Sequence, residues 1–302
     1  MAEDCTLKQL ASLQMADNFP GRVVVTATIN GAPHPFMVDT GGLVTELYDD
    51  VVQKLGLTSS TINPNVEIYD TSGNLRRRYV RVEDFALGPM HAEHKVMVVK
   101  PRGPGEDEGI DGIIGPDVLE HLDVEFDFGG RKLNLISPDH CEGKVVYWSQ
   151  SYTDTDFSLS DDHVVIPMML DGKEVQATLD TGAPATYLSE TAAHRLFGID
   201  IESPGIERDS GAPPGSPYAY RYKFRSLSVA GLAVNNPLVH ILPDLARQAF
   251  NRRHQSKEDL DPVTAPQLKE TPMLLGMDVL SKLHLYIAYK ERKLYITGAN
   301  AH

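Results

Sequence analysis

The chain has 302 residues, of which 41% are hydrophobic and 23% are charged, and its formal net charge is −14. This composition suits a folded protein with a substantial core. The negative charge argues against nucleic acid as a partner, because phosphates bind basic surfaces. No apolar run approaches the roughly 20 residues that a helix needs to cross a bilayer, so we expect no membrane span.

Residues 1–19 precede the first predicted strand of the main body, and we interpret them as an N-terminal extension that supplies an interface strand. The start, "MAEDCTLKQL", has neither the basic region nor the apolar stretch of a signal peptide. Two interpretations stay open. Either "AED" is the processed end of a periplasmic or secreted protein to which a start Met was added, or the start is native and cytoplasmic.

Two segments, residues 21–42 and 162–183, have the same pattern and align without a gap at an offset of 141 residues. The alignment places Asp39 on Asp180. Each copy predicts two strands joined by a tight turn, with Asn-Gly in "INGA" and Asp-Gly in "LDGK". In each copy the second strand is apolar and runs directly into Asp-Thr-Gly. The stretches that follow, 43–57 and 185–199, are helix-like and end at a Gly.

A second pair of segments aligns further along, at an offset of 161 residues. The tripeptide "IIG" ends at Gly115 and "LLG" ends at Gly276, and each reads as a strand end followed by a short helix and a hairpin. About twenty extra residues therefore lie between the two anchors of the second copy, in the region of residues 243–267. We predict one lobe at 20–137, a polar linker at 138–160 and a second lobe at 161–298.

The repeated Asp-Thr-Gly and the later apolar-apolar-Gly resemble the aspartic proteases of the retropepsin and pepsin group, and most closely bacterial retropepsin-like proteins with two fused copies. The resemblance covers both lobes. It implies a mostly β fold with two β-barrel lobes related by a pseudo-twofold axis. The active site would lie between the lobes, beneath a β-hairpin flap.

By this resemblance Asp39 and Asp180 form the catalytic dyad. Two carboxylates in one site cannot both ionise cheaply, so one keeps a proton while the other activates water. The resemblance also implies supporting roles. The threonines would hydrogen-bond across the axis and the glycines would allow close approach of the backbone, at Thr40, Gly41, Gly115, Thr181, Gly182 and Gly276.

The resemblance places flap hairpins at about 68–79 and 209–222. The flap and substrate-binding candidates are Tyr69, Ser72, Gly73, Tyr79, Tyr218 and Tyr220. For the alternating tyrosines of the second hairpin, cross-strand packing is the other interpretation. The run "RRRY" at 76–79 is either a solvated face or a surface for acidic substrate side chains.

Other features have structural explanations or imply absences. Asp117 and Asp278 occupy the first turn of predicted helices, where an acid favours the helix dipole. None of the eleven histidines has metal-ligand spacing, so we expect neither a metal nor a cofactor. Gly42 and Ala183 stand where pepsins carry Ser or Thr, so no hydroxyl stabilises the ionised carboxylates, and a mildly acidic pH optimum follows.

The two cysteines, Cys5 and Cys141, flank the first lobe. Since the terminal strands of a lobe meet at the interlobe sheet in this fold, the resemblance makes the two thiols neighbours. A disulfide would indicate an oxidising compartment such as a periplasm. Two free thiols in a cytosolic protein are the alternative.

The sequence thus predicts a single-chain aspartic endopeptidase acting on a protein or peptide substrate. Because the linker keeps both copies in one molecule, we expect a monomer that is a fused pseudo-dimer. The alternative function is a catalytically silent peptide- or protein-binding module on the same fold.

Overall fold

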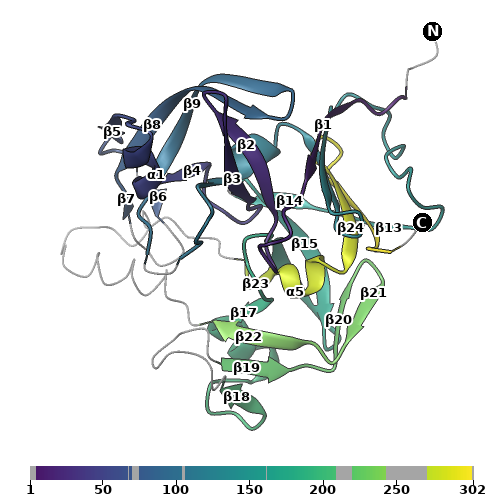
Figure 1. The fold of residues 1–302 in the computed structure, drawn as a ribbon. Helices are drawn as coiled ribbons and strands as arrows, with labels where there is room; N and C mark the ends of the chain where they lie inside the picture. Colours follow the sequence, from purple (N-terminus) through teal and green to yellow (C-terminus); the bar gives the residue numbers. More distant parts are fainter. Residues whose placement is uncertain are drawn as a thin grey trace.

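The computed structural model of the chain describes residues 5–66, 68–69, 75–103, 106–160, 162–208, 220–242 and 271–300. Three of the flap candidates, Ser72, Gly73 and Tyr218, lie outside the described residues. So does the segment at 243–267 that the sequence alignment leaves without a counterpart in the first copy. Figure 1 shows the chain as two β lobes with a further sheet beside them.

The first lobe is a seven-stranded sheet that closes on itself, because β2 pairs with both β3 and β8. As predicted, β2 and β3 form a hairpin, and its turn residues Asn30 and Gly31 have φ of 50° and 81°. A turn of this kind needs positive φ at both positions, which Asn-Gly adopts readily. The strands are β2 (Val24–Ile29), β3 (Ala32–Val38), β4 (Glu46–Tyr48), β5 (Ser59–Thr61), β8 (Arg78–Leu87), β9 (Met90–Lys100) and β10 (Gly112–Ile114).

A separate two-stranded pairing, β6 (Ile68–Tyr69) with β7 (Leu75–Arg76), forms the described part of the first predicted flap hairpin.

The second lobe is a ten-stranded sheet. Its hairpin turn, Asp171-Gly172, again has positive φ at both residues. The strands are β14 (Ser158–Ser160), β15 (His163–Leu170), β16 (Lys173–Leu179), β17 (Tyr187–Ser189), β18 (Ile206–Arg208), β19 (Tyr220–Lys223), β20 (Ser226–Val229), β21 (Leu232–Asn235), β22 (Leu238–Leu242) and β23 (Met273–Leu275).

A six-stranded sheet joins the lobes, in the order β1-β12-β11-β24-β25-β13. It combines strands from both copies, and Val124 of the first copy pairs with Ile287 of the second. One face of this sheet packs into a core that both lobes share. The strands are β1 (Gln9–Gln14), β11 (Asp123–Asp127), β12 (Lys132–Ile136), β13 (Thr153–Asp156), β24 (Leu283–Ala288) and β25 (Lys293–Gly298).

The expectation of helix from residue 43 onward and from residue 185 onward is only partly right. In each copy the first half is a strand, β4 or β17, because these residues pair with β10 or β23 and bury side chains such as Leu47 and Leu188. Helix begins only after the strand. The helical segments are α1 (Asp49–Lys54), α2 (Pro116–Leu119), α3 (Glu190–Ala192), the π-helical η1 (Ala193–Phe197) and α5 (Met277–Leu280).

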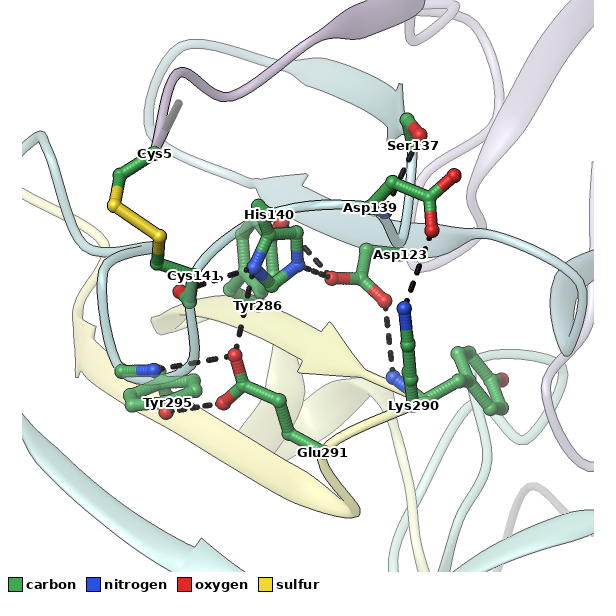
Figure 2. Close-up of polar contacts among 12 residues, drawn as sticks. Cys5, Asp123, Ser137, Asp139, His140, Cys141, Tyr286, Lys290, Glu291 and Tyr295 are labelled. Carbon is green, nitrogen blue, oxygen red and sulfur yellow. Dashed lines mark hydrogen bonds and ion pairs between the residues drawn. A yellow bond between two sulfur atoms is a disulfide. The ribbon is translucent and has the colours of Figure 1, made fainter. Parts of the chain in front are cut away.

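The linker at 138–160 is more ordered than its polar sequence suggests, since it contributes β13 and β14 and buries Val145 completely. Its first half packs on the outer face of the six-stranded sheet, where Val145 meets Tyr286 and Tyr295. Cys5 and Cys141 are joined by a disulfide next to this packing (Figure 2). Among the described residues, no helix is long and apolar enough to cross a membrane.

Candidate active site

The two aspartates of the repeated motif stand at the ends of equivalent strands. Asp39 follows β3, and its N–H donates to Ile114 O at 3.0 Å; Asp180 follows β16, and its N–H donates to Leu275 O at 3.0 Å. Both β3 and β16 run parallel to the strand that carries the apolar-apolar-Gly of the same lobe. Each aspartate is therefore held at a point where two parallel strands end together.

The two carboxyl groups lie against each other's loops. A Cβ placed on Gly41 would lie 2.3 Å from Asp180 Cγ, and a Cβ on Gly182 would lie 2.3 Å from Asp39 Cγ. No side chain fits in either space, so glycine is the residue that allows this close approach. The structure therefore brings the predicted pair together, with one acid from each lobe.

Reciprocal hydrogen bonds between Thr40 and Thr181 tie the two loops together. Each threonine N–H donates to the hydroxyl of the other at 3.1 Å. The hydroxyls donate in turn to backbone carbonyls of the opposite lobe, Thr40 to Leu179 O at 2.6 Å and Thr181 to Val38 O at 2.7 Å. Both threonines are buried, so these four bonds are shielded from water and fix the relative position of the two acids.

In the first lobe, Gly115 lies against the backbone of the active-site loop. A Cβ there would come within 2.5 Å of the Val44 carbonyl carbon. The Gly115 N–H donates to Thr45 Oγ1 at 3.3 Å, and the Thr45 hydroxyl and N–H both donate to Asp117 Oδ1. Lys95 completes the chain by donating to Asp117 Oδ2 at 2.6 Å.

The second lobe repeats this arrangement. Gly276 N–H donates to Thr186 Oγ1 at 3.3 Å, and the Thr186 hydroxyl donates to Asp278 Oδ1 at 2.7 Å. Asp278 and its counterpart in the first lobe thus do more than favour a helix dipole, because they anchor the loop that follows each motif. The sequence analysis missed the two threonines, although the same offset of 141 that aligns the aspartates also aligns them.

The electrostatics of the two acids differ. Burial raises the pKa of both carboxyls, and for Asp39 the nearby charge and hydrogen bond of Asp180 raise the pKa further, well above its ordinary value. Asp180 Oδ1 accepts two N–H groups, from Gly182 at 2.9 Å and Ala183 at 3.0 Å, and these lower its pKa against burial. When the pair shares one proton, these effects favour the proton on Asp39 and the negative charge on Asp180.

A buried ion pair adjoins the dyad, between Glu46 of β4 and Arg76 of β7, with Arg76 Nε donating to Glu46 Oε1 at 3.1 Å. Burial raises the pKa of Glu46, and the charges of Lys100 and Arg76 oppose this effect, whereas the charge of Asp39 adds to it. Only part of the "RRRY" run is therefore a solvated face, since Arg77 is exposed and Arg76 is buried. No sequence pattern pointed to Glu46.

The described flap candidates all belong to paired strands. Tyr69 belongs to β6, and Tyr79 belongs to β8, where it pairs with Ser60 and Val98 inside the sheet of the first lobe. Tyr220 pairs with Arg208 and packs against the core of the second lobe. Within the described ranges, no group of three or more His, Cys, Asp or Glu residues is placed to hold a metal ion.

Comparison with known proteins agrees with this geometry. A family model described as aspartyl protease matches residues 25–118 and 166–279, and each match contains one Asp-Thr-Gly. The crystal structure of an aspartic proteinase from Irpex lacteus is similar over 96% of this chain and 97% of that chain, with a TM-score of 0.56 and 14% sequence identity. The predicted mostly β fold with two acid-protease lobes is confirmed.

A retropepsin-like aspartic protease from Rickettsia conorii also matches, at 20% identity over 44% of this chain and 94% of that chain, with a TM-score of 0.30. No curated protein sequence matches the chain. The predicted resemblance to retropepsin-like and pepsin-like aspartic proteases is confirmed by the family match.

Proposed function

Because the chain belongs to the aspartyl protease family, we propose that it is an endopeptidase that hydrolyses peptide bonds of protein substrates with the Asp39–Asp180 dyad. The observation that carries this proposal is the contact of each carboxyl with the glycine of the opposite motif. This arrangement puts two acids with unequal pKa values in one buried place, as general acid–base catalysis requires.

In the proposed reaction, a water molecule attacks the carbonyl carbon of the scissile peptide while ionised Asp180 accepts one proton of that water. Asp39, which holds a proton, donates a hydrogen bond to the carbonyl oxygen and stabilises the negative charge that develops there. The tetrahedral intermediate then collapses, the C–N bond breaks and the amine leaves with a proton from the dyad. Overall the reaction consumes one water and needs no cofactor.

Both acids come from one chain, and the shared six-stranded sheet holds the lobes together, so we propose that the active form is a monomer. The disulfide between Cys5 and Cys141 supports location in an oxidising compartment, either a periplasm or the exterior of the cell. A cytoplasmic protein with reduced cysteines is the alternative to this location.

Digestion of a peptide library by the wild-type chain, beside Asp39→Ala and Asp180→Ala, tests the function. We expect new peptide ends with the wild type alone, and the residues flanking each cut then define the cleavage preference. Asp139→Ala is the matched control, because Asp139 is an exposed aspartate paired with Lys290 at the surface. Full activity of either dyad variant would rule out the proposal, whereas peptide binding without cleavage by the wild type would favour the binding module.

A further inference from the structure

The loops after the two motifs are held in different ways. In the second lobe, Met277 N–H donates to Ala183 O at 2.9 Å. The offset of 141 places Gly42 on Ala183, and the offset of 161 places Pro116 on Met277. Proline has no backbone N–H. The hydrogen bond that fixes the loop in the second lobe therefore cannot form in the first.

The loop of the first lobe also lacks a second restraint. Ala183 N–H donates to Asp180 Oδ1 at 3.0 Å, whereas Gly42 N–H donates to the main-chain oxygen of Asp39 at 3.4 Å. Glycine is the residue with the greatest conformational freedom. Since a Cβ at Gly42 would lie only 3.0 Å from Asp39 Oδ2, a shift of this loop would act directly on the Asp39 carboxyl.

The carbonyl of Gly42 receives a hydrogen bond from a side chain of the opposite lobe, in place of the backbone N–H that Pro116 lacks. His163, at the start of β15, has Nε2 at 2.7 Å from Gly42 O. A carbonyl oxygen only accepts, so Nε2 carries the hydrogen in this bond. The equivalent residue of the first lobe, Arg22, contacts Met37 Sδ and Asp107 of its own lobe instead. The side-chain contact of His163 across the lobes therefore has no counterpart at Arg22.

We propose that His163 is a positioning residue for the dyad, which replaces across the lobe interface the hydrogen bond that Pro116 removes and holds Asp39 in its reactive position. This inference rests on the proposed protease function. His163 acts through Gly42 and not on the substrate. The position of Asp39, which belongs to the first lobe, thus depends on a side chain of β15 in the second lobe.

A four-member cycle tests the proposal: wild type, His163→Phe, Pro116→Ala and the double variant. Phenylalanine keeps a ring but removes the donor, and the Pro116→Ala change restores the N–H that the second lobe uses. We expect His163→Phe to lower kcat by about 10-fold or more with KM within about 2-fold, because misplacement of a catalytic group mainly slows the chemical step. Pro116→Ala stays near the wild type, and the double variant recovers most of the loss. His163→Gln, which keeps an amide donor, retains more kcat than His163→Phe.

Two results would overturn the proposal: an unchanged kcat in His163→Phe, or a double variant as slow as His163→Phe. Thermal unfolding of the same four proteins separates this inference from the protease function, since it needs no activity. The hydrogen bond predicts that His163→Phe lowers the unfolding midpoint more in the wild-type background than in the Pro116→Ala background. If the shifts in unfolding midpoint of the two single variants add up to that of the double variant, the N–H of residue 116 does not replace the His163 hydrogen bond, and the inference is wrong. If the shifts are not additive but the wild type cleaves no peptide, only the protease function is refuted.

Discussion

Asp180 accepts two backbone N–H groups and Asp39 accepts one, although both acids end the same strand-and-loop motif. The extra bond comes from Ala183, whose counterpart Gly42 turns its N–H to a main-chain oxygen. Hydrogen bonds from N–H groups stabilise a carboxylate more than a carboxylic acid. A difference in loop conformation between the lobes thus gives the two acids different roles in the reaction that we propose.

The raised pKa of Asp39 predicts that the dyad makes the folded chain less stable as pH rises. Below about 3.9, the pKa of an ordinary aspartate, Asp39 is protonated in both states. Above it the unfolded chain binds fewer protons than the folded chain, so the free energy of unfolding falls until the folded pKa is passed. We expect Asp39→Asn to be inactive and yet more stable at pH 7, by about 1 kcal/mol or roughly 2–4 °C.

Thermal unfolding of Asp39→Asn and the wild type at pH 7 and pH 3 measures this effect. The gain belongs to the higher pH, because at pH 3 neither state carries the Asp39 charge. Asp139→Asn serves as a control, since its carboxyl is exposed and paired only at the surface. A gain of equal size at both pH values would show that packing and not ionisation causes it.

A hydroxyl next to Asp39 changes the pH dependence of cleavage. In Gly42→Ser the new Cβ would lie 3.0 Å from Asp39 Oδ2, so the serine hydroxyl can donate a hydrogen bond to the Asp39 carboxyl. This bond favours the ionised form and so lowers the pKa of Asp39. Because the dyad must keep one proton, the alkaline limb of the kcat profile moves to lower pH.

Gly42→Ala is the matched variant for this test, because it adds the same Cβ without the hydroxyl. We expect the alkaline limb of Gly42→Ala to stay at higher pH than that of Gly42→Ser, whatever activity both lose through crowding. Identical profiles for the two variants would mean that the hydroxyl makes no bond to Asp39. A wild-type optimum near pH 3 would contradict the mildly acidic optimum that the missing hydroxyls predict.

The sequence predicted that Asp39 and Asp180 pair because both belong to one short motif that is repeated in the chain, and the structure brings these two side chains together. The offset of 141 residues aligned Asp39 with Asp180, and the second alignment, of Gly115 with Gly276, indicated the two-lobed fold. Thr45 and Thr186 were equally visible in the alignment, but a threonine a few residues beyond a motif is too common to attract notice. Their role depends on a hydrogen bond to an aspartate some 70 to 90 residues away in the chain.

Other features depended on contacts that no pattern encodes. The stretch before α1 has helical spacing, yet Leu47 lies in a strand because β9 and β10 flank it. The Glu46–Arg76 pair joins two elements with unrelated local sequences. His163 makes its hydrogen bond to Gly42, a residue of the opposite lobe that lies 121 positions away in the chain. Tertiary pairing overrode local propensity in the first case, and in the others the fold brought distant residues together.

The disulfide between Cys5 and Cys141 closes a loop across a sequence separation of 136. On the chain-entropy model, a bond of this span stabilises by up to about 5 kcal/mol. We expect the double variant Cys5→Ser/Cys141→Ser to unfold at a lower temperature than the oxidised wild type. Its unfolding temperature should equal that of the wild type measured in the presence of reductant. The mass of the intact protein after alkylation without reductant checks that the bond is present. Alkylation of both cysteines would show that they are free thiols, and the disulfide would then no longer support location in an oxidising compartment.

Next to this disulfide, His140 donates from Nε2 to Asp123 at 2.5 Å on the outer face of the six-stranded sheet (Figure 2). Asp123 is fully buried and also accepts from Tyr286 and from the N–H of Tyr289, both at 3.1 Å. Burial raises the pKa of Asp123, and the bond and charge of His140 oppose that effect. The histidine therefore stabilises a carboxylate that would otherwise be costly in the interior.

Removing this partner should be far more damaging than removing a surface ion pair a short distance away. We expect His140→Ala to lower the free energy of unfolding by about 3 kcal/mol or more, because a buried carboxylate loses its partner. Lys290→Ala breaks an exposed pair with Asp139 and should change it by less than about 1 kcal/mol. Denaturant unfolding of both variants at pH 6 compares them directly, and equal losses would show that His140 contributes no more than an ordinary surface charge.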